Sequence, residues 1–304
     1  MWRSKKIVVS LPVIAVLLFS SLTGVAVSKV KAVHPANGEK NVNVGIIKWV
    51  GVPGFQYDLY IGTTSTPTLY KSNVTDGEVK PIAFSLNSTY RWMVVAKKEG
   101  KPIDTSAVFT FSTLPISLNP NVKYSSFVDT RDYKIYWTTT IAGKEWMVQN
   151  LDYIVDNASF YYDNLIANKV YGQLYLGSVL ATKQKDICPA GWRIPTEQEW
   201  DAMLNAFGGS RVAASALKES SERYWRNSKA ICSNSSGMSI LPAGSRDSKP
   251  SYSNLGKYAF YWTSTISKKK PNSYIQFDLG FMRDAVNSSD GDPTWSYSIR
   301  CIKE

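Results

Sequence analysis

A short acidic segment near the C-terminus carries the side chains that most readily suggest a ligand site. Within residues 284–292, Asp290, Asp292 and Asn287 offer oxygen atoms of the kind that calcium prefers as ligands in proteins. Their spacing differs from that of the twelve-residue EF-hand loop. A solvated turn is therefore the favoured interpretation of this segment, and a calcium site is the alternative.

Tryptophan side chains supply a second kind of candidate, a surface on which a sugar ring or a protein partner stacks. Trp225, Trp262 and Trp295 are the candidates. Trp262 lies inside a predicted strand, so we expect it to pack in the core. The predicted ligand-binding residues are therefore Trp225 and Trp295, together with the two aspartates of the acidic segment.

The histidine count excludes several catalytic classes. The chain has one histidine, His34, so a zinc site built from several histidines is excluded. That residue lies near the predicted mature N-terminus, where a Ser-His-Asp or Cys-His triad is not expected. Paired carboxylates that hydrolyse glycosides are defined by their separation in space, so the sequence neither finds nor excludes them.

Length and charge limit the class of protein. A chain of 304 residues predicts about two domains. Its 44% hydrophobic and 19% charged residues are typical of a globular protein, and its 13% aromatic residues favour β-structure. The net charge is +11, but the basic residues are scattered and the densest run is Lys268–Lys270. We interpret that run as a solvated loop, and we expect no nucleic-acid partner.

The first 28 residues are typical of a secretion signal. Arg3, Lys5 and Lys6 precede an apolar run over 7–19, and small residues follow it. The run is short for a membrane span, so we predict cleavage after Ala26 or Ser28 and no membrane span in the mature chain. An uncleaved N-terminal anchor is the alternative. No cysteine follows the run, so a lipoprotein anchor is excluded.

Residues 29–115 alternate in polarity over short segments that end at turn residues, a pattern that predicts an all-β sandwich. The order of its aromatic residues resembles that of a fibronectin type III (immunoglobulin-like) domain. The resemblance implies that the hydroxyl of Tyr90 ties back to the preceding loop. Such domains serve as spacers or as adhesive modules, and we favour the spacer. Residues 116–123 are the predicted linker, which Pro120 stiffens.

Residues 124–304 predict a mixed α+β domain. Phe127–Tyr136 and Trp137–Val148 each indicate a hairpin. Thr196 and Glu199 have the spacing of a capping box, and a stripe of apolar residues follows them up to Phe207, so a helix is predicted here. A second short helix is expected over 210–218. Strands and loops are expected after Trp225.

Several motifs of this C-terminal part occur in a family-specific order. They are Gly-Lys-Glu-Trp-Met-Val-Gln-Asn-Leu (143–151), Cys-Pro-Ala-Gly-Trp-Arg-Ile-Pro-Thr-x2-Glu-Trp (188–200), Leu-Pro-Ala-Gly-x-Arg (241–246), Tyr-Trp-Thr-Ser-Thr (261–265) and Ser-Ile-Arg-Cys-Ile-Lys (298–303). Together they resemble the Fibrobacter succinogenes major paralogous domain (FISUMP), an extracytoplasmic bacterial family largely without assigned activity. Some are also similar to the formylglycine-generating branch of C-type-lectin-like folds.

These resemblances imply an α+β, C-type-lectin-like domain with long loops at one end. The pair of close cysteines that would bind copper in the formylglycine-generating enzymes is missing, and so are the Glu-Pro-Asn and Trp-Asn-Asp signatures of calcium-dependent lectins. The family pattern pairs Cys188 with Cys301. Cys232 then stays outside the disulfide and is expected to be buried, although the sequence alone leaves its pairing with either of the others open.

The sequence therefore favours a secreted or cell-surface bacterial protein without enzymatic activity. In this hypothesis a β-sandwich spacer carries a lectin-like module whose loops bind polysaccharide or another extracellular protein. No cofactor is expected apart from the calcium alternative. An extracellular enzyme that uses carboxylates or a metal is the second hypothesis.

Overall fold

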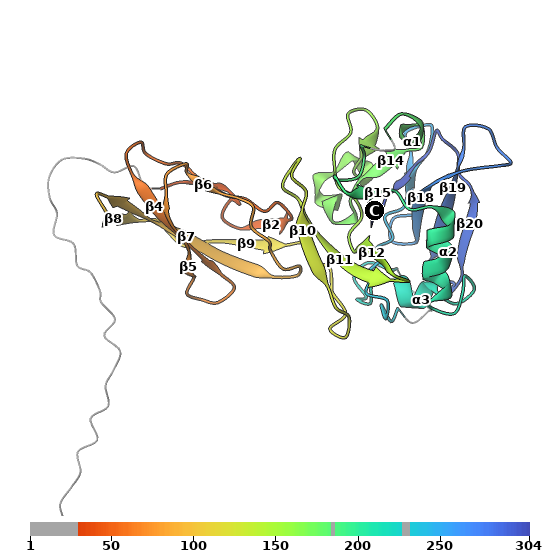
Figure 1. The fold of residues 1–304 in the computed structure, drawn as a ribbon, viewed down its shortest axis with the longest axis horizontal. Coiled ribbons are helices and arrows are strands. Elements are labelled where there is room, and N and C mark those ends of the chain that lie inside the picture. Colours follow the sequence, from red (N-terminus) through yellow and green to blue (C-terminus); the bar gives the residue numbers. More distant parts are fainter. Residues whose placement is uncertain (1–29, 184–185, 227–231) are drawn as a thin grey trace, which may run out of the picture.

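The computed structural model describes residues 30–183, 186–226 and 232–304. The predicted signal peptide lies outside these residues. The chain is mostly β-sheet with few helices, and it forms an N-terminal and a C-terminal unit arranged end to end (Figure 1). Among the described residues, no helix has the length and apolar character that crossing a membrane requires.

The N-terminal unit consists of strands alone. They are β1 (Ala32–His34), β2 (Glu39–Val42), β3 (Ile47–Trp49), β4 (Gln56–Gly62), β5 (Thr68–Val74), β6 (Glu78–Val79), β7 (Thr89–Lys98), β8 (Lys101–Thr105) and β9 (Phe109–Thr113). One sheet has the order β1-β3-β6, and another has the order β2-β9-β7-β4-β5, with β8 paired to β7. Side chains from both sheets, such as Trp49 and Trp92, meet in one core.

Strand β7 shows why this sequence forms a sandwich. Its side chains alternate, so that Trp92, Val94 and Ala96 are buried and their neighbours are not. Period-two alternation places every second residue on the core side of a strand. The hydroxyl of Tyr90 accepts a hydrogen bond from the backbone N–H of Ser85 at 3.0 Å. This is the tie to the preceding loop that the sequence predicts.

The C-terminal unit combines sheets with short helices. Its strands are β10 (Ser125–Val128), β11 (Ile135–Ile141), β12 (Lys144–Met147), β13 (Ser159–Phe160), β14 (Leu174–Leu176), β15 (Trp192–Arg193), β16 (Ser245–Arg246), β17 (Tyr252–Ser253), β18 (Tyr258–Ile266), β19 (Tyr274–Gly280), β20 (Val286–Asp290), β21 (Ser296–Ser298) and β22 (Ile302–Lys303). Its helices are the 3-10 helices η1 (Tyr162–Asn164) and η2 (Ile166–Tyr171) and the α-helices α1 (Val179–Lys183), α2 (Glu197–Asn205) and α3 (Ala214–Leu217).

Two sheets organise this unit. One has the order β10-β11-β12-β22-β15, in which β10, β11 and β12 form the two predicted hairpins and β12 pairs with β22, the last strand of the chain. The other has the order β13-β14-β21-β18-β19-β20, with β16 beside β21 and β17 beside β16. The end of the chain thus takes part in both sheets, because β21 and β22 are separated by only a few residues.

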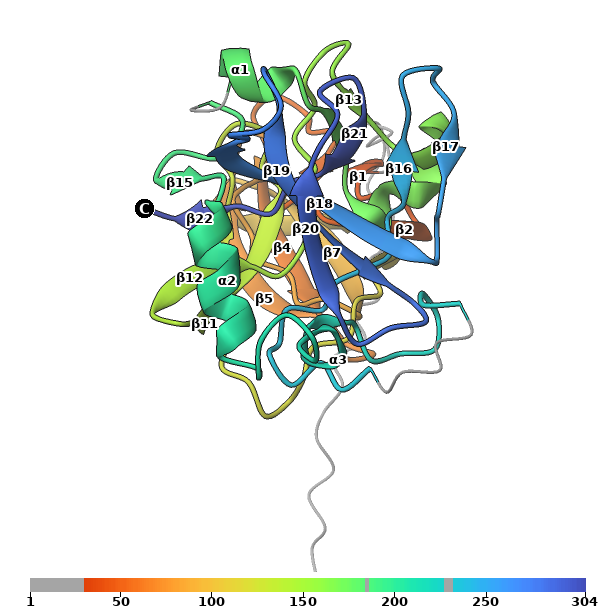
Figure 2. The same cartoon turned by 90° about the vertical axis from the view of Figure 1, so that its right-hand side faces the viewer.

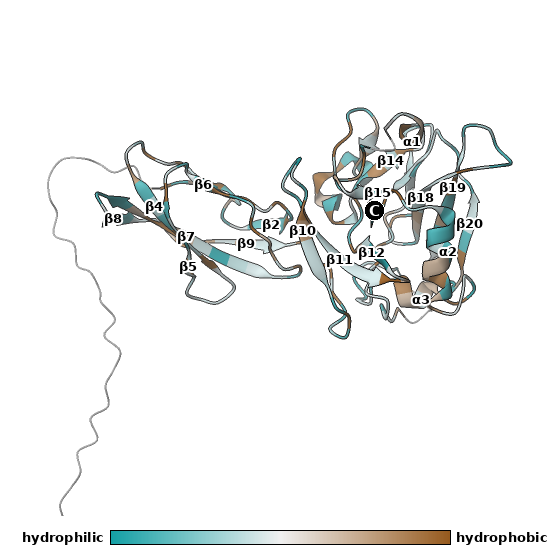
Figure 3. Cartoon of the chain, viewed as in Figure 1, coloured by the Kyte–Doolittle hydropathy of each residue, from teal (hydrophilic) through white to brown (hydrophobic). Residues whose placement is uncertain are grey.

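Helix α2 forms where its capping box predicts. The Thr196 hydroxyl accepts a hydrogen bond from the Glu199 N–H, and the Glu199 carboxylate accepts one from the Thr196 N–H. Trp200, Met203 and Leu204 are buried against the β-sheet core. The start of α2 is therefore polar, whereas its end and α3 are apolar (Figure 3). Helix α3 is shorter than the predicted 210–218.

The acidic segment is a strand and not the solvated turn that the sequence favours. Val286–Asp290 pairs antiparallel with β19, with Val286 opposite Leu279 and Asp290 opposite Ile275. It is the last strand of its sheet, and its exposed residues Asn287–Ser289 have low β-propensity. Backbone pairing with β19 and the burial of Val286 override that local preference.

The predicted linker is held against the C-terminal unit. Residues 116–123 contain no helix or strand, but Ile116 is buried in the C-terminal core. The N–H of Ser117 donates to the Glu219 carboxylate at 3.3 Å, and its carbonyl accepts from the Ser239 hydroxyl at 3.0 Å. The segment is therefore fixed at the surface of one unit and does not act as a flexible spacer.

A disulfide closes the C-terminal unit. Cys188 and Cys301 are bonded, with their Cα atoms 6.0 Å apart, as the family resemblance implies. This bond ties the segment before β15 to the last residues of the chain. Cys232 stands outside that disulfide, and its half-buried side chain packs against the core of the unit.

Candidate ligand-binding pocket

A pocket of about 720 Å³ opens at one end of the C-terminal unit. Its volume is within the range of small-ligand sites. Helix α1 and strands β13 and β16, which contribute lining residues, lie in the upper half of Figure 2. The lining comes from several separate segments and includes Asn157, Phe160, Ala181, Arg246, Tyr274 and Thr294.

Arg246 reaches this pocket because a glycine allows two backbone segments to approach closely. A Cβ atom at Gly244 would lie 2.4 Å from the Ser253 carbonyl oxygen, so a residue with a side chain does not fit there.

 The φ angle of Gly244 is +70°, which lies in the left-handed region that glycine adopts readily. Strand β16 follows at once, and Arg246 pairs with Tyr252 of β17 and with Ser296 of β21. The backbone of Arg246 is therefore held from both sides.

The side chain of Arg246 is stacked on an aromatic ring. Its guanidinium lies 3.9 Å from the centre of the Phe160 ring and 5.9 Å from that of Tyr252. Such contacts orient a guanidinium and leave its edge available for hydrogen bonds. The Nε atom of Arg246 is buried and has no hydrogen-bond partner in the described part of the chain.

The charge of Arg246 is not compensated inside the pocket. Among the described residues that line it, Arg246 is the one charged side chain, and the rest are apolar, hydroxyl or amide groups. None of the ion pairs between described residues includes Arg246. A positive group thus faces a cavity with no negative group on its walls.

The wall that contains Pro293 and Thr294 lies next to a buried tryptophan. Trp262 is fully buried, and its Nε1 donates to the Tyr175 carbonyl at 2.8 Å. A Cβ atom on Gly291 would lie 2.2 Å from the Trp262 ring, so only glycine lets the chain cross here. Pro293 and Thr294, which line the pocket, follow directly. The prediction that Trp262 packs in the core is confirmed.

The two predicted aspartates support this wall. Asp290 accepts a hydrogen bond from the Ser267 hydroxyl at 2.6 Å. Asp292 accepts from the N–H and the hydroxyl of Thr294 at 2.9 and 2.7 Å, and these bonds, with Lys270 at 3.7 Å, lower the pKa of its carboxyl group. The described residues contain no cluster of three or more His, Cys, Asp or Glu side chains with metal-binding geometry. The calcium site stays a prediction without a formed ligand set.

The two predicted tryptophans have different positions. Trp225 is 3% exposed, and its Nε1 donates to the Ile240 carbonyl at 3.0 Å. Its prediction as a surface stacking residue is therefore wrong, because Ile240 and the core around it cover the ring. Trp295 is half-buried against Tyr297, next to the loop that lines the pocket. Its ring is not among the lining side chains.

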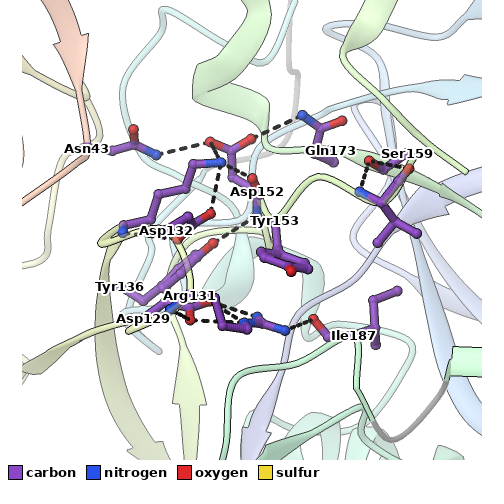
Figure 4. Close-up of polar contacts among 12 residues, drawn as sticks. Asn43, Asp129, Arg131, Asp132, Tyr136, Asp152, Tyr153, Ser159, Gln173 and Ile187 are labelled. Carbon is purple, nitrogen blue, oxygen red and sulfur yellow. Dashed lines mark hydrogen bonds and ion pairs between the residues drawn. The ribbon is translucent and has the colours of Figure 1, made fainter. Parts of the chain in front are cut away.

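A second polar cluster lies where the two units meet, and its centre is Asp152 (Figure 4). The side chain of Asp152 is 4% exposed. Its carboxylate accepts hydrogen bonds from Asn43 of the N-terminal unit at 3.0 Å and from Gln173 at 3.3 Å. The Lys134 ammonium lies 3.1 Å from the same carboxylate and also donates to the Asp152 carbonyl.

The cluster extends along the first hairpin of the C-terminal unit. Lys134 lies 3.4 Å from Asp132, so one ammonium serves two carboxylates. Beside them, Arg131 forms several hydrogen bonds with Asp129, the shortest at 2.7 Å, and stacks 3.8 Å from the centre of the Tyr153 ring (Figure 4). Each carboxylate in this cluster has a cation as its partner.

Burial shifts the pKa of several groups at this junction. It raises the pKa of Asp132, against the opposing effect of Lys134. It lowers the pKa of Lys169, although Glu39 and Asp152 act in the opposite direction. It also lowers the pKa of His34, whose Nδ1 lies 3.5 Å from Glu39. Perturbed groups often mark functional sites, but buried ion-pair networks perturb pKa values too.

Backbone contacts show what the junction does. Val44 forms an antiparallel bridge with Lys134, and the N–H of Gly45 donates to the Tyr133 carbonyl at 2.7 Å. Ile135 packs in the core of the N-terminal unit. The polar cluster is therefore enclosed by a backbone bridge and by apolar packing, and it holds the two units together.

Sequence reasoning missed the residues that line the pocket. Asn157 and Phe160 come from one segment and Tyr274 from another that is distant in the chain, so no local spacing signals that they meet. Arg246 did carry a local signal, because it is the last residue of the motif at 241–246. The glycine of that motif explains the position of Arg246, but the sequence alone gives no reason to assign the arginine a role.

Comparison with known families agrees with the sequence motifs. Residues 139–303 match the Fibrobacter succinogenes major domain, and the chain belongs to this family. The match includes every residue that we name in the pocket. The domains of this family are uncharacterised, with no known catalytic role. A comparison with curated proteins finds no match.

Proposed function

We propose that this chain is an extracytoplasmic binding protein without enzymatic activity, and that its C-terminal unit binds polysaccharide in the pocket beside Arg246. The observation that carries the proposal is the pocket itself, a cavity of about 720 Å³ at the loop end of the domain. Export, which the predicted signal peptide supports, would bring this pocket into contact with extracellular polymers.

The chemistry of the lining supports a sugar as the ligand. Asn157 and Asn272 supply amide groups, and Ser248 and Thr294 supply hydroxyl groups. Phe160 and the other apolar side chains supply the nonpolar surface. Sugar rings carry hydroxyl groups at their edge and C–H groups on their faces, and they fit a wall that combines few polar groups with apolar surface.

The same lining argues against the enzyme hypothesis for this pocket. The described lining residues include no carboxylate, histidine or cysteine that would serve as a general acid, a base or a nucleophile. The carboxylates with perturbed surroundings lie at the junction, where Asp152 is buried and engaged with Lys134. An enzyme would need a site other than these two.

The proposal also assigns a fold to each of the two units. We propose that the N-terminal unit is a fibronectin type III-like spacer, which its sheet orders and the Tyr90 contact support. We propose a C-type-lectin-like fold for the C-terminal unit, supported by its mixed sheets and by the pairing of β22 with an early hairpin.

Retention of the mature chain on a panel of polysaccharides tests this function. Ala181 lines the pocket and is exposed on α1, so Ala181→Trp fills the cavity without disturbing the core. We expect retention by at least one polysaccharide, its loss in Ala181→Trp, and no release of sugar. Ala202→Trp, at an exposed position of α2 outside the pocket, is the matched control.

Calcium and a chelator are added in parallel experiments. Loss of retention with the chelator would restore the Asp290 and Asp292 loop as a metal site. Retention that is the same in Ala181→Trp would remove the pocket from the proposal, and release of reducing sugar would favour the enzyme hypothesis.

A further inference from the structure

The charge of the pocket allows its ligand to be defined more closely. Arg246 is the one charged group among the described lining residues, and its Nε has no hydrogen-bond partner there. A buried or half-buried cation without a counter-ion is unfavourable unless a ligand supplies the negative charge. We propose that the pocket binds an acidic polysaccharide, with the carboxylate of a uronic acid paired to Arg246. This inference rests on the proposed polysaccharide-binding function.

The orientation of Arg246 favours a carboxylate. Stacking on Phe160 at 3.9 Å fixes the plane of the guanidinium, and pairing of β16 with β17 and β21 fixes its backbone. A planar guanidinium that is already oriented binds a planar carboxylate through two parallel hydrogen bonds. The hydroxyl and amide groups of Ser248, Asn157 and Asn272 then face the remainder of the sugar ring.

The loops beside the pocket carry further positively charged side chains. Lys249 lies between the lining residues Ser248 and Pro250, and Lys268 and Lys269 lie in the loop between Ile266 and Asn272. All three lysines are exposed. A polymer with a carboxylate on each sugar would place further negative charges near these loops.

The acidic residues of the same loops are engaged locally. Asp247 accepts hydrogen bonds from the N–H groups of Lys249 and Ser251, at 2.8 and 3.0 Å. Asp290 and Asp292 accept hydrogen bonds from Ser267 and from Thr294. These carboxylates stabilise their loops, and none of them pairs with Arg246.

The test compares one polymer with and without its carboxylates. Polygalacturonate is the probe, and the same polymer with its carboxylates reduced to hydroxymethyl groups is the neutral control. Binding of the full mature chain is measured by calorimetry at low and at moderate salt. We expect the wild-type chain to bind polygalacturonate at least about tenfold more tightly than the reduced polymer, the effect of one charge-assisted contact.

Two arginine variants show whether Arg246 is responsible. We expect Arg246→Gln to lose about tenfold in affinity for polygalacturonate and to bind the reduced polymer as the wild type does. Arg211→Gln, at an exposed arginine outside the pocket, removes the same charge and is expected to change neither affinity. Arg246→Lys keeps the positive charge but lacks the planar guanidinium, so we expect an affinity for polygalacturonate between those of the wild type and Arg246→Gln. Circular dichroism and thermal melting verify that each variant folds.

The outcomes separate this inference from the function on which it rests. If the wild-type chain binds neither polygalacturonate nor any polysaccharide of the panel, the proposed function fails and the inference fails with it; if it binds a neutral polysaccharide of the panel but not polygalacturonate, the inference alone fails. If it binds both polymers equally, or if Arg246→Gln binds polygalacturonate as tightly as the wild type, the acidic-ligand inference is wrong while polysaccharide binding stands. Equal losses in Arg246→Gln and Arg211→Gln, or equal binding of dextran sulfate, would indicate a general effect of net charge and overturn the inference.

Discussion

The junction and the pocket use charged side chains in opposite ways. At the junction, the carboxylate of Asp152 is surrounded by Lys134, Asn43 and Gln173, so that its charge and its hydrogen bonds are satisfied inside the protein. In the pocket, Arg246 stands alone among uncharged groups. A satisfied cluster holds parts of a chain together, whereas an unsatisfied charge in a cavity is available to a ligand.

The comparison also explains why perturbed pKa values do not point to the proposed ligand site. The junction contains groups whose pKa values burial shifts, such as Asp132 and Lys169. Asp132 already has the Lys134 ammonium as its partner, and the carboxylates of Glu39 and Asp152 act on Lys169. The pocket is distinguished by a missing partner, which a pKa value alone does not reveal.

Removal of Asp152 is expected to have the largest effect on stability. Asp152→Ala leaves the Lys134 ammonium buried with only the more distant Asp132 as its counter-ion. We expect a loss of about 3–5 kcal/mol in the free energy of unfolding, measured by chemical denaturation. Asp156→Ala, at an exposed residue nearby, is the control. A loss in Asp152→Ala no larger than that of the control would mean that the cluster does not hold the junction.

The ion pair between Arg193 and Glu199 shares a feature with each region. Its charges are paired, as at the junction, but both side chains are partly exposed. Arg193 donates to Glu199 at 2.6 and 2.8 Å and, with the capping bonds of Thr196, lowers the pKa of Glu199 to about 2. When folding lowers the pKa of a carboxyl group, the folded state is stabilised at pH values above the pKa of the unfolded state. That stabilisation is lost as the pH falls through the pKa of the folded state.

We therefore expect Glu199→Gln to lose about 1–2 kcal/mol in the free energy of unfolding at neutral pH, after allowance for solvent screening. The difference from wild type should shrink as the pH falls from about 4.5 toward 2, because the wild-type carboxylate becomes protonated in that window. Denaturation curves across this range measure it. Glu197→Gln, in the same helical turn, is the control, and a difference that does not depend on pH would contradict the expectation.

Local signals allowed much of the fold to be predicted. The capping box at Thr196 and Glu199 lies within a few residues, so it identified helix α2. The alternation around Trp92 likewise identified β7. Trp225 was misjudged because its burial depends on Ile240, which is distant in the chain, and β20 was missed because its pairing with β19 outweighs its polar composition. The pocket required side chains from separate segments, whose meeting no spacing in the sequence encodes.

The smallest stability effect is expected at Arg246, and it completes the comparison. Arg246→Gln removes the stacking on Phe160 but leaves no buried carboxylate without a partner, because none faces Arg246 in the described lining. We expect a change of less than about 1 kcal/mol in the free energy of unfolding, the range of one cation–π contact. Denaturation of Arg246→Gln beside Arg211→Gln measures it. A loss as large as that of Asp152→Ala would place Arg246 among the structural charges, and the contrast between pocket and junction would then be lost.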